Sequence, residues 1–321
     1  MVTGADGFIG SHLTEALVAC GCRVRAFCYY NSFGSRGWLD SVPASLLEQI
    51  DVFMGDVRDP NGMREALRGT DAVFHLAALI GIPFSYHSPD SYIDTNVRGT
   101  LNVLQAARDL GLARVVVTST SEVYGTARYV PIDEKHPLQG QSPYSASKIG
   151  ADKLAESFHR CFDLPVVTVR PFNTYGPRQS ARAVIPTIVS QLVAGASRLH
   201  LGALNPTRDL TYVSDTVAGF IALAGCDEAV GREVNLGTGH EISIVDLASL
   251  LCDVVGAHPA VVVDDERVRP ARSEVERLVS DPSLASALCG WKAATSLRQG
   301  LAVTADWFRA NQSRYTTGYE V

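Results

Sequence analysis

The sequence lacks the features that mark membrane, secreted and nucleic-acid-binding proteins. No apolar run among its 321 residues approaches the length of a membrane span, and no signal peptide precedes the first motif. Acidic residues outnumber basic ones, and the formal net charge is −6 at pH 7. Without a basic patch the chain is not expected to bind nucleic acid, and an anionic ligand must be held by individual arginines or backbone amides.

Cysteine is present but is not arranged for disulfides or metal ions. None of the seven cysteines forms a Cys-x-x-Cys pair, and none clusters with histidine. This spacing predicts reduced thiols in a cytoplasmic protein and no metal site. Hydrophobic residues make up 46% of the chain and charged residues 19%, which is ordinary for a globular protein. We expect one two-lobed unit or two closely joined domains.

A glycine-rich turn follows a short apolar segment that ends at Thr3, and an amphipathic run over residues 11–19 comes next. Such a turn between a strand and a helix lets the backbone approach a pyrophosphate, whose charge then faces the helix N-terminus. A second strand over residues 23–27 predicts an α/β fold with a doubly wound parallel sheet. Only two residues precede Thr3, so the first strand is unusually short or lacks residues before it. The residues expected at the pyrophosphate are Gly4, Gly7, Phe8, Ile9 and Gly10.

The choice of cofactor depends on the end of the second strand, where a carboxylate usually binds the adenosine ribose of NAD. Residues 27–32 contain no carboxylate, and Arg36 is the nearest cation for the 2′-phosphate of NADP. We expect NAD, with NADP as the alternative. A third strand over residues 52–57 ends in Asp56 and Val57, which are placed to meet the adenine. The alternative role for Asp56 is the N-terminal cap of the next helix.

A fourth buried strand over residues 72–78 ends in small or apolar residues that allow a cofactor to lie close, namely Leu76, Ala77 and Ala78. The spacing of apolar residues then predicts one long helix over residues 89–110. Asn96 in this helix either faces the cofactor or is bound by neighbouring backbone groups.

A fifth, valine-rich strand over residues 114–118 leads into Thr120, Ser121 and Glu122. Residues at the carboxyl end of a strand in an open α/β sheet lie at the ligand crevice. Two hydroxyls and a carboxylate at this edge are suited to proton transfer. The alternative is an ordinary capped turn with a solvated acid.

Tyr144 and Lys148 stand four residues apart in a helix-compatible segment. On a helix this spacing stacks both side chains on one face. The lysine charge is expected to lower the pKa of the tyrosine from its usual value of about 10, so that the phenol can act as a base. The same pair also arises by chance on solvated helix faces, so the functional interpretation depends on the other two motifs.

Together these motifs resemble the extended short-chain dehydrogenase/reductases, the NAD-dependent epimerase/dehydratase family that acts on nucleotide sugars. The glycine-rich turn, the segment 120–125 and the Tyr144 and Lys148 pair occur in the family's order and spacing, and segments 170–177 and 208–215 are also similar. Segments 75–86 and 269–281 look most like the N-acetylhexosamine 4,6-dehydratases of the legionaminic-acid type. Glu122 resembles the acid of the 4,6-dehydratases and decarboxylases. Many hexose 4,6-dehydratases have aspartate at the position of Ser121. In having serine there, this chain resembles the GDP-mannose dehydratases.

The resemblance implies a Rossmann-like domain over residues 1–170 and a smaller substrate-binding lobe, mainly residues 171–321, with some segments returning to the sheet. It implies a nucleotide-sugar 4,6-dehydratase in which NAD(P) transiently oxidises C4. Tyr144, assisted by Lys148, takes the O4 proton, Glu122 takes the C5 proton before water leaves C6, and Thr120 steadies O4. A 4-epimerase or a decarboxylase of the same family is the alternative. A non-catalytic relative is disfavoured because these residues are intact.

The second half of the chain is expected to bind the substrate. Arginine can hold phosphate oxygens in a bidentate manner, so Asn173, Arg208 and Arg269 are expected at the nucleotide diphosphate, with a surface ion pair as the alternative for each arginine. Pro171 and Asn173 are also expected beside the cofactor. A strand is predicted over residues 233–236, and helices are predicted over residues 183–194, 215–224, 244–255 and 291–308. The resemblance also implies a homodimer through the helices over residues 89–110 and 144–161.

Overall fold

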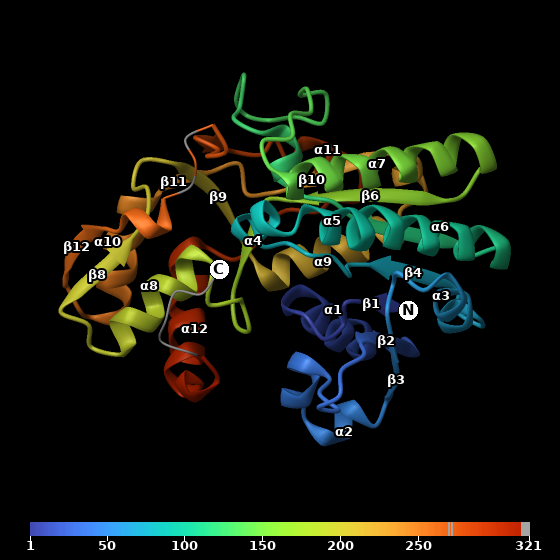
Figure 1. Cartoon of the computed structure of the whole chain (residues 1–321), viewed down its shortest axis with the longest axis horizontal. Coiled ribbons are helices and arrows are strands. Elements are labelled where there is room, and N and C mark those ends of the chain that lie inside the picture. The colour runs from blue at the N-terminus through green and yellow to red at the C-terminus, as the bar shows by residue number, and fades with distance from the viewer. Residues whose placement is uncertain (269, 271, 316–321) are drawn as a thin grey trace.

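The computed structural model describes residues 1–268, 270 and 272–315. Its centre is a seven-stranded sheet in the order β10-β6-β5-β4-β1-β2-β3, and every neighbouring pair is parallel (Figure 1). This confirms the predicted doubly wound sheet. The strands are β1 (Val2–Thr3), β2 (Val24–Tyr29), β3 (Ile50–Gly55), β4 (Ala72–His75), β5 (Arg114–Thr118), β6 (Val166–Pro171) and β10 (Glu233–Leu236).

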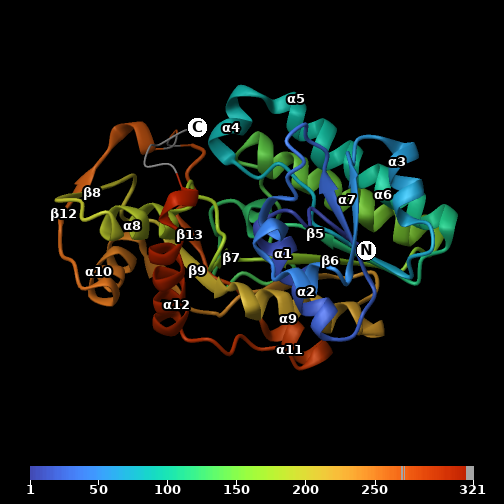
Figure 2. The ribbon, with the colours of Figure 1, turned by 90° about the horizontal axis from the view of Figure 1, so that it is seen from below.

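Helices cover both faces of this sheet, as the two views show (Figures 1 and 2). The inward side chains of the strands are mostly valine, alanine and phenylalanine, and they pack into one apolar cluster on each face. One face carries α1 (Phe8–Ala19), α9 (Val213–Ala224) and α11 (Ser283–Cys289), and the other carries α3 (Pro60–Leu67), α6 (Gly99–Leu110) and α7 (Pro143–Phe162). Burial on both faces is what a parallel sheet requires.

The predicted helix over residues 89–110 is continuous in the structure but changes its winding. It begins as α5 (Pro89–Tyr92), widens into a π-helical segment (Ile93–Arg98) and continues as α6. π-helical turns carry an extra residue and often occur at functional sites. The segment that holds Asn96 is therefore the part of the helix that departs from regular geometry.

The second lobe is built mainly from residues that follow β6. Its larger sheet has the order β11-β9-β13, with β7 also paired to β9, and β8 and β12 form a separate parallel pair. Helices α8, α10 and α12 pack together around an apolar core at the left of Figure 1. The strands are β7 (Asn173–Tyr175), β8 (Arg198–Leu201), β9 (Thr207–Tyr212), β11 (Glu241–Ser243), β12 (Ala260–Val263) and β13 (Arg277–Leu278). The remaining helices are α2 (Ala44–Leu47), α4 (Ile82–His87), α8 (Val184–Val193), α10 (Ile244–Val255) and α12 (Leu297–Ala310).

Two elements have different ends in the structure from those predicted from the sequence. The strand predicted over residues 72–78 stops at His75. The last helix begins at Leu297 and not at Trp291, because Ser296 and Gln299 form a capping box that fixes its first turn. Trp291 lies in the preceding segment, where its indole nitrogen donates to the Asp215 carbonyl at 2.9 Å.

A buried ion pair joins helix α7 to the sheet. Arg170, only 2% exposed, donates from Nη2 to Oδ2 of the fully buried Asp152 at 3.0 Å. A second nitrogen of the guanidinium donates to the Tyr124 hydroxyl at 3.1 Å, and that hydroxyl donates to Asn235 at 2.7 Å. Asn235 is in β10, so this network ties an edge strand from the second half of the chain to α7.

Replacing one member of this pair is expected to destabilise the protein strongly. Arg170→Met leaves the Asp152 carboxylate buried without its main partner, which typically costs about 3–5 kcal/mol. Chemical denaturation should show this loss in the free energy of unfolding. The exposed pair between Arg309 and Asp306 provides the control, because Arg309→Met should change stability by less than about 1 kcal/mol. Equal losses in the two variants would contradict the structural role of the buried pair.

Candidate active site

The glycine-rich turn connects β1 to the N-terminus of α1 at the centre of the sheet. Gly4 has a φ of +66°, and a Cβ there would lie 2.9 Å from the Ala77 backbone. A Cβ on Gly10 would lie 2.0 Å from the Gly4 carbonyl oxygen. Gly7 is the N-cap of α1 and offers no side-chain cap, and the first turn contains no acid. The turn thus needs its glycines and leaves amides free for an anion.

A chain of buried hydrogen bonds runs from this turn toward the catalytic helix. The Thr3 hydroxyl bonds Nδ1 of His75 at 2.8 Å and accepts from the amides of Leu76 and Ala77, both at 3.1 Å. On the other side of the ring, Nε2 of His75 lies 3.0 Å from the Thr100 hydroxyl, which donates to the Asn96 carbonyl at 2.6 Å. Burial lowers the pKa of His75 to about 3, so the ring is neutral, with Nε2 as its donor.

Asn96 holds the loop after β4 against helix α7. Its side-chain amide donates to the Leu79 carbonyl and to the Ser147 hydroxyl, both at 2.9 Å, and its side-chain oxygen accepts from the Leu79 amide at 2.8 Å. The side chain is thus bound by the backbone, which was the alternative to direct contact with a cofactor. Sequence reasoning missed His75, Thr100 and Ser147, although a histidine in an otherwise apolar strand was a usable signal.

Tyr144 lies beside Thr120 and Glu122, as the motifs predicted. It is buried near the N-terminus of α7, and its ring packs edge-on against Tyr92 with centroids 6.2 Å apart. Burial raises its pKa above the usual value, a hydrogen bond from Thr120 opposes the rise, and the charge of Glu122 adds to it. The expectation of a lowered pKa is wrong for the protein alone, because the loss of solvent outweighs the hydrogen bond with Thr120.

Thr120 also shapes the turn in which Glu122 and Ser121 lie. Its backbone is extended, and its hydroxyl accepts from the Glu122 amide at 3.2 Å as the N-cap of the short helix Ser121–Tyr124. Ser121 is buried and Glu122 is partly exposed. The capped turn therefore exists, and it brings the acid to the tyrosine.

Lys148 is buried one helical turn after Tyr144. Its ammonium donates to the Thr118 carbonyl at 2.5 Å, at the end of β5. Burial lowers its pKa to about 8, and the charge of Asp152, one further turn along α7, opposes this change. Asp152 in turn accepts from Ser119 at 2.8 Å and pairs with Arg170. The predicted Tyr144 and Lys148 pair is thus part of a buried charged cluster and not of a solvated helix face.

The residues predicted at the adenine lie at the end of β3. Asp56 pairs with Arg58 at 2.5 Å and also accepts from its amide at 2.9 Å, which holds the pKa of Asp56 below its usual range. The N-cap of α3 is Asp59, so Asp56 does not have the alternative role of helix cap. The Val57 carbonyl accepts from Asn102 at 2.9 Å, which fixes this loop against α6.

The residues predicted at the substrate diphosphate lie in different surroundings. Asn173 begins β7, and its buried side-chain oxygen has no hydrogen-bond partner among the described residues. Arg208 is 7% exposed and donates to the Val275 carbonyl at 2.8 Å and to Glu274 at 3.0 Å. Arg208 thus forms the ion pair that was the alternative to phosphate binding, but this pair with Glu274 is largely buried and does not lie on the surface. Pro171 ends β6 beside Leu236, and Arg269 lies outside the described residues.

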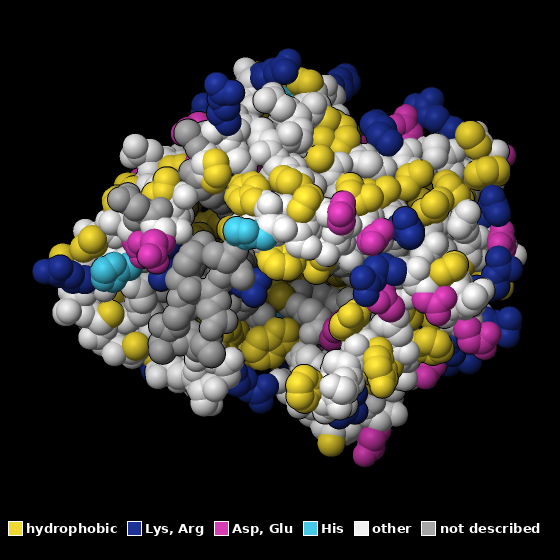
Figure 3. Space-filling model, viewed as in Figure 1, with side chains coloured by type: hydrophobic (Ala, Val, Ile, Leu, Met, Phe, Trp, Pro, Cys, Tyr) yellow, Lys and Arg dark blue, Asp and Glu magenta, His cyan; other side chains and the backbone are white. Residues whose placement is uncertain are grey.

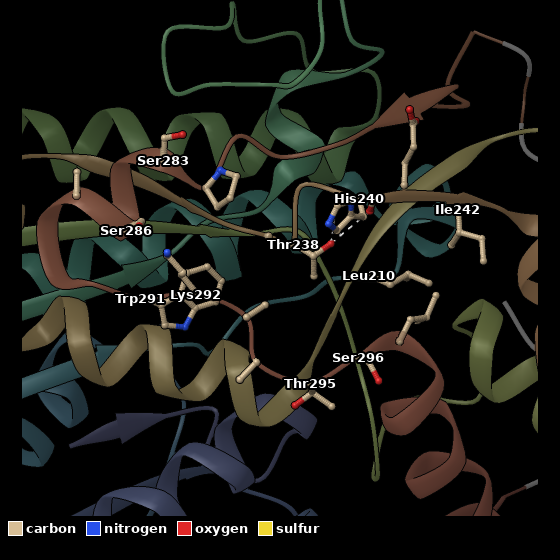
Figure 4. Close-up of a pocket in the computed structure, with 17 residues that line it drawn as sticks. Leu210, Thr238, His240, Ile242, Ser283, Ser286, Trp291, Lys292, Thr295 and Ser296 are labelled. Atoms are coloured by element: carbon tan, nitrogen blue, oxygen red, sulfur yellow. Dashed lines mark hydrogen bonds between the residues drawn. The ribbon is translucent and has the colours of Figure 1, made fainter.

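A cavity of ≈ 840 Å³ opens where the second lobe meets α11 of the main sheet. It lies between the loop that follows β10 and the segment that joins α11 to α12. Figure 4 shows Thr238 and His240 on one side and Trp291 and Lys292 on the other. None of the predicted catalytic or cofactor residues lines it.

Within residues 1–268, 270 and 272–315, no helix is long and apolar enough to cross a membrane, and no cluster of three or more His, Cys, Asp or Glu side chains is arranged for a metal ion.

Known proteins resemble this chain over nearly its whole length. The sequence model of the GDP-mannose 4,6 dehydratase family matches residues 1–304. A UDP-glucose 4-epimerase of Mycolicibacterium smegmatis is 32% identical over 314 residues, which cover 96% of this chain and 98% of that protein. A dTDP-glucose 4,6-dehydratase of Streptomyces antibioticus is 32% identical over 318 residues, which cover 98% of this chain and 93% of that protein.

Solved structures show the same fold. DesIV, a dTDP-glucose 4,6-dehydratase from Streptomyces venezuelae determined with NAD and DAU bound, has a TM-score of 0.86 and 32% identity over 98% of both chains. The UDP-glucuronic acid 4-epimerase of Bacillus cereus, in complex with UDP-glucuronic acid and NAD, has a TM-score of 0.87 and 26% identity, and the match covers 97% of this chain and 98% of that one.

The parallel sheet, the open glycine-rich turn and the buried Tyr144 and Lys148 pair define a Rossmann-type enzyme of the short-chain dehydrogenase/reductase class. Within that class, the chain belongs to the GDP-mannose 4,6 dehydratase family of NAD-dependent epimerases and dehydratases. This confirms the family that the motifs indicated. Both dehydratases and epimerases are among its relatives, so family membership does not choose between the two reactions.

The lowered pKa of Lys148 predicts how stability changes with pH. An unfolded lysine keeps its usual pKa of 10.5, whereas folded Lys148 has a pKa of about 8. Between these values the unfolded chain binds more protons, so the free energy of unfolding should rise with pH. Relative to Lys148→Met, the wild type should gain on the order of 1–3 kcal/mol from pH 8 to pH 10.5.

The comparison uses urea denaturation at several pH values. Lys153→Met, which changes an exposed lysine on the same helix, serves as the control and should track the wild type across this range. A constant difference between the wild type and Lys148→Met would show that burial does not depress the pKa of this lysine.

Proposed function

We propose that this protein is a nucleotide-sugar 4,6-dehydratase that converts an NDP-hexose or NDP-N-acetylhexosamine to its 4-keto-6-deoxy product. The proposal rests mainly on one observation: Glu122 follows β5 at its carboxyl edge, close enough to Tyr144 for its charge to raise the pKa of the phenol. Oxidation and epimerisation at C4 need only the tyrosine and the hydroxyl. A second proton-transfer group on the same side of the site suits the elimination that a dehydratase must also perform.

The described residues fit a dinucleotide. The uncapped amides of α1 and the open glycine turn suit its pyrophosphate, and we assign this role to Gly4, Gly7, Phe8, Ile9 and Gly10. Asp56, Val57, Leu76, Ala77 and Ala78 follow the neighbouring strands β3 and β4. Asn96 lies in the π-helical segment and fixes the loop after β4, and Tyr144, Lys148, Pro171 and Asn173 complete the set. Bound NAD, or NADP in the alternative, would take a hydride from C4 of the sugar and return it to C6 after water has left, while a proton equivalent to the one taken from O4 goes back to C5.

The chain's own residues would move the protons. Tyr144 takes the proton of the sugar O4, and Lys148, fixed on the Thr118 carbonyl, favours the phenolate once substrate and cofactor are in place. Thr120 donates to O4 and steadies the charge that develops there. Glu122 takes the C5 proton and, because residue 121 is a serine, also supplies the proton to the hydroxyl that leaves C6. Ser121 is the remaining polar group of this turn.

The nucleotide diphosphate is proposed to lie in the second lobe, so that residues 1–170 hold the cofactor and residues 171–321 mainly hold the sugar nucleotide. The unpartnered Asn173 oxygen supports this placement. Arg208 would share its guanidinium between the phosphates and Glu274, and Arg269 would add a second cation. The legionaminic-acid type of N-acetylhexosamine dehydratase is the subgroup that we propose within the family.

A 4-epimerase is the second candidate, since the epimerase of Mycolicibacterium smegmatis matches this chain as well as the dehydratases do. Epimerisation at C4 does not need a base at C5, so an epimerase mechanism assigns no chemical role to Glu122. A decarboxylase would need a cation aimed at a C6 carboxylate, and the sequence assigns no residue to that role. We also propose a cytoplasmic location, which the seven free cysteines support.

Glu122→Gln separates the dehydratase from the epimerase. The amide cannot take the C5 proton, so the rate of 4-keto-6-deoxy product formation should fall by about 10²–10⁴-fold. Oxidation at C4 should persist, because Tyr144 and Thr120 are unchanged, and reduced cofactor should therefore accumulate. The assay follows the alkali-absorbing product, and mass spectrometry follows the loss of water, with several nucleotide hexoses as substrates.

Glu65→Gln, which alters an exposed acid on α3, is the control and should leave the rate unchanged. Full water loss by Glu122→Gln would remove Glu122 from the mechanism. A wild type that only interconverts C4 epimers would replace the dehydratase proposal with the epimerase.

We further propose that the protein forms a homodimer through the face covered by α5, the π-helical segment, α6 and α7. Figure 3 shows hydrophobic side chains gathered over part of this face, and Ile93 and Phe162 are 49% and 50% exposed there. Light scattering should give the mass of a dimer, and Ile93→Asp should shift it toward the monomer. Val303→Asp, which alters an equally exposed valine on α12, should not shift it. A monomeric wild type would contradict the proposal.

A further inference from the structure

The usual place for the acid that binds the adenosine ribose is the carboxyl end of β2. In this chain β2 ends at Tyr29 and the following residues carry no carboxylate. A carboxylate reaches the same place from the glycine-rich turn, because Oδ2 of Asp6 accepts from the Tyr29 amide at 3.3 Å. Asp6 thus stands at the strand end although it precedes β2 in the sequence.

The position of Asp6 is fixed by the segment that follows β2. The Trp38 amide donates to the Asp6 carbonyl at 2.9 Å, and a Cβ on Gly37 would lie 2.9 Å from the Asp6 Cβ. Close packing of Gly37 therefore keeps the Asp6 side chain directed at the end of β2. Asp6 is half-buried. Burial raises the pKa of its carboxyl group, and the hydrogen bond from the Tyr29 amide opposes that rise.

Two arginines near this corner, Arg36 and Arg58, already have acidic partners. Nε of Arg36 pairs with Oδ1 of Asp40 at 2.9 Å, and the Arg36 amide donates to the other oxygen of that carboxylate, also at 2.9 Å. Arg58 follows β3, whose last residue pairs with Tyr29, and forms its ion pair with Asp56. A 2′-phosphate would have to compete with these carboxylates for either arginine.

We infer that Asp6 selects NAD over NADP, by accepting a hydrogen bond from the ribose 2′-hydroxyl and by repelling a 2′-phosphate. The inference rests on the proposed function, because it assumes that a dinucleotide occupies the glycine-rich turn. It replaces the absent acid of β2 with an acid from a different element that reaches the same point. A hydrogen bond to a charged acceptor of this kind is typically worth about a tenfold to hundredfold change in affinity.

The test is a competition for binding that does not depend on turnover. The purified protein is exchanged against an equimolar mixture of NAD⁺ and NADP⁺, and the bound dinucleotides are quantified by mass spectrometry. Titration calorimetry then gives each dissociation constant. The wild type should bind NAD⁺ at least tenfold more tightly, and Asp6→Asn should reduce that preference by about tenfold or more.

Asp51→Asn is the matched control, since it removes an equal charge from the opposite end of the β2 and β3 pair. It should leave the preference unchanged. Thermal melting verifies that each variant is folded. If Asp6→Asn does not fold, the ratio of NAD⁺ to NADP⁺ bound by the wild type still tests the inference. Preference of the wild type for NADP⁺, or an unchanged ratio in folded Asp6→Asn, overturns the inference. A wild type that binds neither dinucleotide overturns the proposed function instead.

Discussion

The site depends on one chain of buried hydrogen bonds that joins three elements of the sheet's first half. Thr3 in β1 bonds His75 in β4, and His75 bonds Thr100 in α6. Because burial keeps the imidazole neutral, the ring can donate on one side and accept on the other without leaving a charge in the core. The same chain continues through Asn96 to α7, so the cofactor turn and the catalytic helix share one rigid support.

Lys148 and the charged groups around it lie in the protein interior, where the dielectric constant is low. Lys148, Asp152 and Arg170 are all buried, and each would be costly without the others. Their mutual interactions allow a lysine with a pKa of about 8 to remain in the core. This cluster does not lower the pKa of Tyr144, because burial of the phenol is the largest influence and raises that pKa. In the proposed reaction the phenolate is therefore favoured only when ligands complete the site.

The two lobes are linked by strands that cross between them. β10 from the second half closes one edge of the main sheet, and β7 passes from the end of β6 to the sheet of the second lobe. Residues at these crossings, such as Asn173, lie where a sugar nucleotide would bridge the lobes. The selection of NAD and the choice of elimination would then depend on two acids, Asp6 and Glu122, that stand at different strand ends of the same edge.

Local patterns in the sequence were enough to predict the parallel sheet, most helices and the meeting of Thr120, Glu122 and Tyr144, because strand periodicity and edge position are short-range properties. They did not reveal that His75 links β1 to α6, or which residues Arg208 binds, and they predicted the wrong direction for the pKa shift of Tyr144. These properties depend on burial and on contacts between distant segments. The same holds for Asp6, whose carboxylate meets the end of β2 only after the turn and that strand pack together. The sequence thus determined which elements form, whereas tertiary packing decided which groups lose water and which charges meet.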